Sequence, residues 1–177
     1  YTQGQLNKTD VDTDISISGS PNAFFAVSVQ GENGAVEMYT RDGSWIVNQD
    51  GYLTTREGYM VLGQNGPVRI AAGDFKVNKD GSINVNGNIV DTLRVVEFVD
   101  TTGLQKIGNN LVQAPEGLQT RPFSGEVIQG YIEDSNVNAI EEMVDIITAL
   151  RSYEANQKVI QSYDSTLEKT VNDIGRV

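Results

Sequence analysis

The stretch that decides the fold is NAIEEMVDIITALRSYEANQKVIQSYDSTLEKTVND, residues 138–173, which contains no proline or glycine and many strong helix formers. We predict one long helix over residues 139–173. Asn138 is a suitable N-cap, Glu141 can complete a capping box, and Gly175 ends the pattern. At about 1.5 Å per residue such a helix is roughly 50 Å long, whereas typical strands span only about 17–20 Å.

Apolar residues recur along this helix at seven-residue intervals, with others at three- and four-residue steps between them. The pattern predicts a coiled-coil-like assembly seam made by Met143, Ile146, Leu150, Tyr153, Ile160, Tyr163, Leu167, Val171 and Ile174. Polar residues interrupt the seam at Asn156, Gln157 and Asp164, so we expect it to accept a particular partner helix rather than to form a generic zipper.

A second apolar stripe, Ile140, Val144 and Ile147, lies only near the start of the helix and could face the β region or another subunit. The simplest alternative is a helix that packs back on its own sheet. A helix of roughly 50 Å would overhang that sheet, however, so the overhanging part needs an upstream helix or a neighbouring chain as its partner.

Upstream of the helix, short β-branched and aromatic runs alternate with Gly, Asn and Asp, which is typical of antiparallel strands. We predict strands at Phe24–Val29, Val36–Thr40, Trp45–Asn48, Tyr59–Leu62, Ser82–Val85, Leu93–Val99 and Val127–Ile132. Five dipeptides suited to tight hairpins favour a meander: Asp42-Gly43, Asp50-Gly51, Asn65-Gly66, Asp80-Gly81 and Asn86-Gly87.

The predicted fold class is therefore mainly β, with an antiparallel, hairpin-rich β body followed by one long C-terminal α-helix. We expect residues 1–14 to be a linker from a preceding N-terminal region, residues 15–135 to form the β body, and residues 136–177 to carry the helical assembly segment.

Composition excludes several kinds of chemistry. The 177 residues contain no His and no Cys, which rules out a Ser-His-Asp triad, a zinc site with His or Cys ligands, and disulfides. The formal net charge is −11, which argues against binding to nucleic acid or to anionic lipid, and no run is apolar enough to insert into a membrane. Proteins are the partners that such a surface favours.

Three candidate sites have plainer interpretations. Asn48-Gln-Asp50-Gly51 and Asn78-Lys-Asp80-Gly81 resemble the start of a calcium loop but lack its twelfth acidic ligand, so we predict hairpin turns. The carboxylate pairs Glu133-Asp134 and Glu141-Glu142 are adjacent residues that do not converge on one atom. Trp45 could form a glycan platform but is expected in the core. We predict no catalytic residue, no metal site, no cofactor and no enzymatic activity.

Three segments resemble the bacterial flagellar rod and hook proteins. Gly130–Asn156 is similar to the family's "GxLExSNV" stretch and the helix "EMVxxIxxxRxYExN" that follows it, and Tyr39–Tyr59 is similar to its "YTRxGxF…DxxGxLVxxxGY" segment. Phe24-Phe25-Ala-Val matches the family's "GDGFFxV" strand, although Gly19-Ser-Pro-Asn22 replaces its turn. The matching signature residues are Tyr39, Thr40, Arg41, Gly43, Ser135, Asn136, Val137, Glu142, Met143, Val144, Arg151, Tyr153, Glu154 and Asn156.

The resemblance implies an axial protein of the flagellar basal body that polymerises into a helical tube and transmits torque from motor to hook. It implies assembly with itself, with other rod and hook proteins and with surrounding ring proteins, after passage through the flagellar type III export apparatus. The family begins with a helix and an "ANNxANxxTxG" motif that has no counterpart before Leu6, so we expect an N-terminal region to precede this sequence. The short β region favours a rod component over a hook protein.

The competing hypothesis is a secreted β-rich module that binds glycan or calcium and oligomerises through a helical stalk. It accounts for the turns and the aromatic residues but not for the match of the helix to the rod and hook signature.

Overall fold

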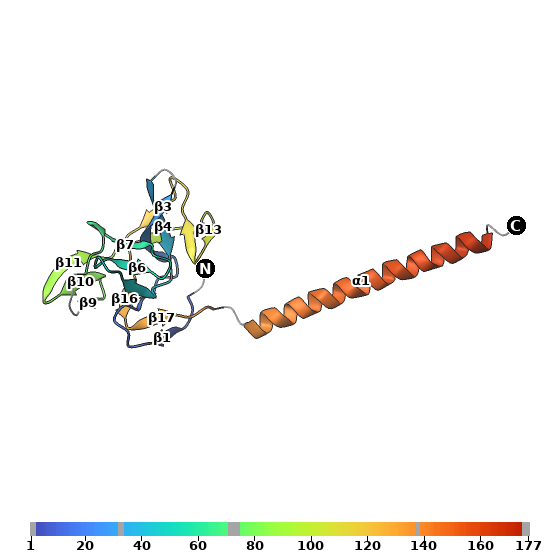
Figure 1. The fold of residues 1–177 in the computed structure, drawn as a ribbon, viewed down its shortest axis with the longest axis horizontal. Helices are drawn as coiled ribbons and strands as arrows, with labels where there is room; N and C mark the ends of the chain where they lie inside the picture. Colours follow the sequence, from blue (N-terminus) through green and yellow to red (C-terminus); the bar gives the residue numbers. More distant parts are fainter. Residues whose placement is uncertain (1–2, 32–33, 71–74, 137–138, 175–177) are drawn as a thin grey trace. The chain divides into compact units, whose positions relative to one another are not determined.

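The structure is a computed structural model that describes residues 3–31, 34–70, 75–136 and 139–174. The chain divides into two compact units, Tyr1–Asn136 and Val137–Val177. The described residues of the first unit form strands and loops, and those of the second form a single helix, α1 Ala139–Ile174 (Figure 1). The fold class, mainly β with one long C-terminal helix, is confirmed.

The largest sheet of the described β body joins ten strands, all antiparallel. Seven strands lie in the order β13-β14-β4-β3-β7-β6-β5, while β12 pairs with β3 and β15, and β8 pairs with β7. Their bounds are β3 Ala23–Gly31, β4 Gly34–Thr40, β5 Trp45–Val47, β6 Leu53–Thr55, β7 Met60–Gly63, β8 Gly66–Pro67, β12 Val95–Phe98, β13 Gln105–Gly108, β14 Leu111–Gln113 and β15 Thr120–Arg121.

Three smaller sheets complete the described body. One has the order β11-β10-β9, and two consist of the pairs β2 with β16 and β1 with β17. Their bounds are β1 Leu6–Lys8, β2 Ile15–Ser18, β9 Phe75–Val77, β10 Ser82–Val85, β11 Asn88–Thr92, β16 Glu126–Gln129 and β17 Tyr131–Glu133. Strand β1 lies within residues 1–14, which the sequence suggests as a linker, and it pairs with the last strand of the body.

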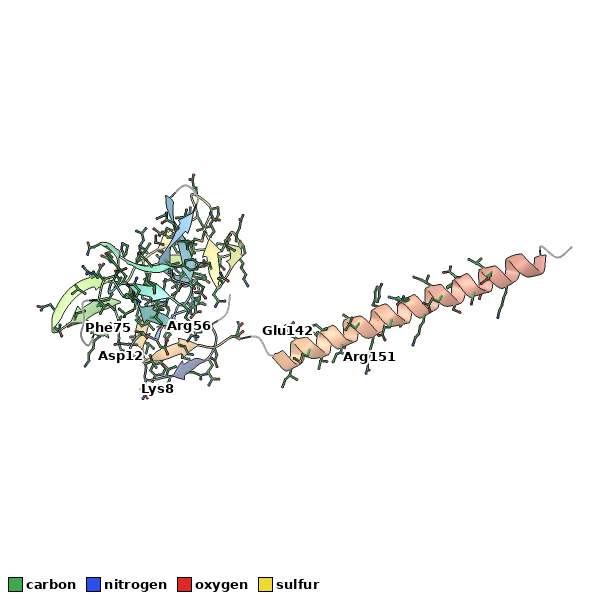
Figure 2. The ribbon with its side chains drawn as sticks, viewed as in Figure 1. Lys8, Asp12, Arg56, Phe75, Glu142 and Arg151 are labelled. Atoms are coloured by element: carbon green, nitrogen blue, oxygen red, sulfur yellow. The ribbon has the colours of Figure 1, made fainter. Side chains whose placement is uncertain are left out.

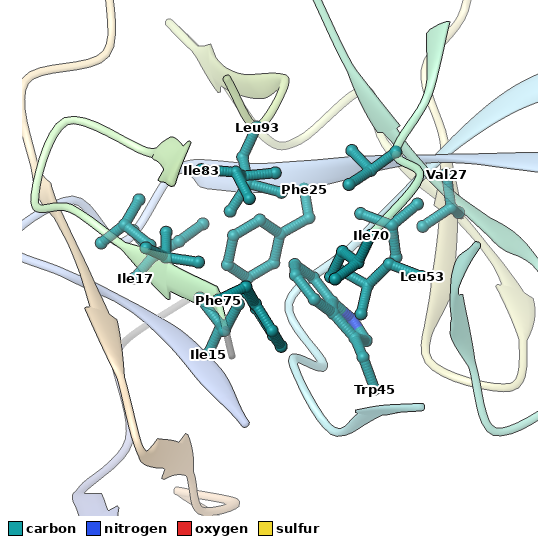
Figure 3. Close-up of a cluster of buried hydrophobic side chains, with 14 of the residues drawn as sticks. Ile15, Ile17, Phe25, Val27, Trp45, Leu53, Ile70, Phe75, Ile83 and Leu93 are labelled. Atoms are coloured by element: carbon teal, nitrogen blue, oxygen red, sulfur yellow. The ribbon is translucent and has the colours of Figure 1, made fainter. Parts of the chain in front are cut away.

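The main core is formed by buried side chains from most strands of the body (Figure 3). At its centre the ring of Phe25 meets the indole of Trp45 edge to face, with centroids 4.7 Å apart. Ala23, Phe25 and Val27 of β3 all point into this core because alternate residues of a strand share one face.

The intervening residue of β3, Phe24, belongs to a second cluster on the opposite face of the sheet. Phe98 lies between Phe24, at a centroid distance of 5.9 Å, and Tyr39, at 5.1 Å. Leu104 and Val112 complete the buried part of this cluster. The large sheet is therefore covered on both faces at this point, which explains the continuous burial of Ala23–Val27.

The Asn-x-Asp-Gly segments form hairpin turns, as predicted. Asn48 N–H donates to the Tyr52 carbonyl and Asn78 N–H donates to the Ser82 carbonyl, and Gly51 and Gly81 have φ of 82° and 84°. Each turn joins two strands that pair directly, β5 with β6 and β9 with β10.

The hairpin predicted at Asp42-Gly43 is wrong. Strand β4 lies between β3 and β14, whereas β5 pairs with β6, so the dipeptide links strands that do not adjoin. Gly43 is required there for a different reason: a Cβ atom at this position would lie 1.5 Å from the carbonyl oxygen of Ile15. Long-range pairing therefore replaces the simple meander that the turns suggested.

Candidate functional site

Helix α1 exposes the apolar side chains of the predicted seam (Figure 2). Among the described seam residues, the least exposed is Leu150, at 57%, and the most exposed is Tyr153, at 70%. The others in this exposed row are Met143, Ile146, Ile160, Tyr163 and Leu167. The side chains of Val171 and Ile174 lie outside the described residues.

The apolar surface of α1 is wide at its start and narrow towards its end. Ile140, Val144 and Ile147 are 75%, 55% and 50% exposed and add a second apolar face to the first turns. On a straight helix, residues seven positions apart differ by about 20° in their direction around the axis, so the row of seam residues winds slowly around α1. Two helices that keep such rows in contact along their length form a left-handed supercoil. The role of this exposed row as a surface for packing on another helix stays a prediction of the sequence pattern.

The predicted N-cap of this helix, Asn138, and the signature residue Val137 lie outside the described residues, as does the side chain of Glu141. The capping box therefore stays a prediction. The other helical signature residues, Glu142, Arg151, Glu154 and Asn156, are all exposed, as expected if they act in contacts between chains.

The signature residue Arg41 joins four segments of the β body. Its guanidinium donates to the backbone carbonyls of Ser20 and Ala23, both at 2.7 Å, and to that of Ile17 at 3.4 Å. It also pairs with the carboxylate of Glu133, with Nη2 2.6 Å and Nε 3.0 Å from Oε2. Both charged side chains are largely buried, at 17% and 14% exposed, so the planar fork of arginine is used almost completely.

Glu133 also binds the start of the described chain. Its Oε1 accepts a hydrogen bond from the Gly4 N–H at 2.9 Å, next to the pairing of β1 with β17. A Cβ at Gly4 would lie 1.8 Å from the carbonyl oxygen of Asp134, so the two segments meet at a glycine. Arg41 and Glu133 thus clamp the first and last strands of the body at one place.

The other signature residues of the YTRDGS segment have separate structural roles. Tyr39 packs edge to face on Phe98 and donates a hydrogen bond to Glu37 at 2.9 Å. Burial, followed by that bond, raises the pKa of Tyr39 to about 12. The Thr40 hydroxyl donates to the carbonyl of Asn110 and accepts from the N–H of Asp42.

Ser135 and Asn136, where the body ends, lie beside this clamp. They line a hollow of 660 Å³ together with Arg41, Lys106 and Asn110. The structure therefore brings Arg41 and Gly43 to the same end of the body as Ser135 and Asn136, although the two pairs are far apart in the sequence.

Sequence reasoning missed the buried carboxylate of Glu97, which is completely inaccessible to solvent. It accepts hydrogen bonds from Arg121 Nε at 2.8 Å and from the Ser124 N–H at 2.9 Å. Burial acts to raise its pKa, but the nearby Ser20 hydroxyl, the Ser124 N–H and the Arg121 guanidinium outweigh it and lower the pKa to about 2. The signal in the sequence was an acidic residue inside the apolar run Val95–Val99.

The remaining candidate residues have structural positions. Trp45 is buried, 2% exposed, and donates from Nε1 to the carbonyl of Asp42, so it is not an exposed platform for glycan. The carboxylate of Glu133 forms an ion pair with Arg41, and Asp134 accepts a hydrogen bond from Asn7.

No cluster of potential metal ligands occurs among the described residues. The described helix is too polar to cross a membrane.

Two family models match the chain. The model for "Flagellar basal body rod FlgEFG protein C-terminal" matches residues 128–174, which include α1 and the strand before it. The model for "Flagellar hook protein FlgE/F/G D1 domain" matches residues 16–85 of the β body.

Individual proteins are similar along almost the whole chain. The flagellar basal-body rod protein FlgG of Buchnera aphidicola from Acyrthosiphon pisum is 36% identical over 184 residues, which cover 96% of this chain and 68% of the relative. FlgG of Agrobacterium fabrum is 34% identical, covering 93% of this chain and 65% of the relative. The rod protein FlgF of Rhizobium meliloti is 32% identical, with 97% and 71% covered.

Proposed function

Since this chain belongs to the family of flagellar rod and hook proteins that includes FlgE, FlgF and FlgG, we propose that it is a structural component of the flagellar basal-body rod. Its activity is polymerisation: copies join into a helical tube that transmits torque from the motor to the hook. It acts as a building block rather than as an enzyme.

The observation that carries this proposal is the exposed seam of α1. Full burial of one large apolar side chain contributes about 1.5–3 kcal/mol, and at least seven such side chains are exposed along one described helix. An isolated helix gains little stability from propensity alone, so most of the stability of α1 has to come from packing on other helices. Those partners are an upstream helix of the same protein or helices of neighbouring copies.

The β body supplies the other half of the assembly. The clamp of Arg41 and Glu133 fixes the strand that leads towards the helix, so a force on α1 is passed into a folded body. When neighbouring subunits join through two different surfaces and the ring does not close, the product is a helical tube.

We propose other rod and hook proteins as further partners, together with the ring proteins around the rod. Delivery is proposed to use the flagellar type III export apparatus. The formal charge of −11 supports contacts with proteins rather than with nucleic acid or anionic lipid.

The seam is tested by a double substitution, Ile160→Asp with Leu167→Asp, made in the chromosomal gene. Charge at two seam positions opposes helix packing, so we expect the variant to be absent from purified basal bodies on immunoblots. The thermal unfolding of the β body should not change.

The matched control is Ile89→Asp with Ile107→Asp, which makes the same change at exposed isoleucines of the body. We expect this control protein in basal bodies at the normal level. Recovery of the seam variant at the wild-type level would contradict the proposal, and so would a loss of body stability, because α1 would then be part of the core.

A further inference from the structure

The three methionines of the chain differ in how far their side chains are covered. Met38 lies in β4 and packs against the main core, and Met60 in β7 is 37% exposed. Met143, in the second turn of α1, is 63% exposed. It is therefore the methionine that is most accessible to a reagent in solution.

The composition makes the Met143 thioether a preferred target for oxidants. The chain contains no Cys, so no thiol competes with methionine for a two-electron oxidant. The single Trp, Trp45, is buried in the main core. The formal charge of −11 does not repel an uncharged oxidant such as hydrogen peroxide.

The surface of α1 around Met143 is apolar. Residues three and four positions apart are neighbours on a helix, which places Ile140, Ile146 and Ile147 next to Met143. All three are at least half exposed. Met143 thus lies in the widest part of the apolar surface of α1, where the proposed function requires contact with other helices.

We propose that Met143 is a reversible oxidation site, and that its sulfoxide keeps an unassembled subunit from joining the rod. This inference rests on the proposed function, because it adds a chemical control to the same helix surface. The reagent is an oxygen-atom donor of the peroxide class.

The oxidation is a transfer of one oxygen atom. A lone pair of the Met143 sulfur attacks one oxygen of hydrogen peroxide, and the O–O bond breaks. The hydroxide that leaves takes the proton of the transferred oxygen and becomes water. The sulfur loses two electrons and the peroxide gains them. Methionine sulfoxide reductases reverse the step with two thiols, which become a disulfide while the oxygen leaves as water.

The sulfoxide changes what this surface can bury. A thioether is apolar and adapts to irregular gaps, whereas the sulfoxide oxygen is a polar acceptor that needs a hydrogen bond when it is covered. The isoleucine side chains around Met143 cannot donate one. We therefore expect the oxidised helix to associate about tenfold more weakly or worse.

The reaction is confined to the subunit before assembly. When α1 packs on other helices, the contacts that cover its apolar surface also cover the Met143 sulfur. Oxidation therefore controls incorporation, and subunits already in a rod keep a reduced Met143.

Peptide mapping by mass spectrometry tests the site on the purified full chain treated with hydrogen peroxide. We expect Met143 to be oxidised several-fold faster than Met60 and Met38, with no change in the unfolding of the β body. Methionine sulfoxide reductases and a thiol reductant should then restore Met143. Equal rates of oxidation at the three methionines would overturn the assignment of the site.

Substitutions test the consequence in the bacterium that encodes the protein. Met143→Gln imitates the polar sulfoxide, whereas Met143→Leu keeps an apolar side chain of similar volume. We expect Met143→Gln at about one tenth of the wild-type level in purified basal bodies, and Met143→Leu at the normal level. The matched control, Met60→Gln, makes the same change in the β body and should be incorporated normally.

Oxidation itself is followed in cells exposed to hydrogen peroxide while new basal bodies form. We expect the fraction of Met143 sulfoxide to be about tenfold lower in basal bodies than in the unassembled pool. Equal fractions in the two pools, or normal incorporation of Met143→Gln, would overturn the inference. Failure of the proposed function has a different signature, since the wild-type protein would then be absent from basal bodies even without oxidant.

Discussion

The β body buries its large apolar side chains, whereas helix α1 exposes them. Phe25 in the body is 1% exposed and touches Trp45, whereas Leu167 in α1 is 61% exposed. Both belong to regular apolar patterns, one with a period of two and the other with a period near 3.5. The body completes its own core, and on the proposed function the helix carries a surface that other helices complete.

This difference separates two contributions to function. Residues that stabilise the body determine whether a rigid unit exists, and we propose that residues on α1 determine whether such units join. A substitution in one region should leave the property of the other unchanged, and three experiments test that separation.

The largest effect is expected from Phe25→Ala. Loss of a buried phenyl ring leaves a cavity in the main core, which typically costs about 3–5 kcal/mol of unfolding free energy. Chemical denaturation followed by Trp45 fluorescence measures it. The matched change on the helix, Leu167→Ala, should shift the same transition by less than about 0.5 kcal/mol. Equal losses of unfolding free energy in the two variants would contradict the proposed distinction between body and helix.

A smaller loss is expected from Arg41→Lys. Lysine keeps the charge but cannot bind Glu133 and three backbone carbonyls at once, so we expect the body to lose about 2–3 kcal/mol. Hydrogen exchange should show the loss first at the pairing of β1 with β17. Unchanged protection of Leu6–Lys8 would mean that Arg41 is not the clamp of these strands.

The smallest of the three effects depends on pH. Because the pKa of Glu97 is lowered to about 2 from 4.5, its charged form stabilises the fold above pH 4.5, and this contribution is lost as the pH falls towards 2. We expect a loss of roughly 2 kcal/mol over that range, moderated by the half-exposed Arg121. Glu97→Gln should be less stable at pH 7 and should lose less on acidification. An identical pH profile for both proteins would remove Glu97 as the cause.

Local signals in the sequence were sufficient for some elements. The helix follows from an uninterrupted run of good helix formers, and the turns at Gly51 and Gly81 follow from residues that tolerate positive φ. The spacing and exposure of the apolar residues on the helix also followed from the sequence, whereas their role as an assembly seam stays a prediction.

The pairings between strands that are distant in the sequence could not be predicted from local signals. Nothing near Leu6 indicates that β1 pairs with β17, and nothing near Asp42 indicates that β4 lies beside β14. The role of Gly43 depends on a carbonyl of Ile15 that approaches from another strand. The partners of Arg41 are likewise distant in sequence. The sequence motif therefore identified Arg41 as a signature residue but did not predict its contacts with Glu133.

The most direct test of the axial role is electron microscopy of basal bodies from a strain that lacks this gene. We expect missing or truncated rods in the deletion strain, complete rods when the wild-type gene is restored, and no restoration by the gene with Ile160→Asp and Leu167→Asp. Complete rods in the deletion strain, with no related gene to substitute, would contradict the assignment of this protein to the rod.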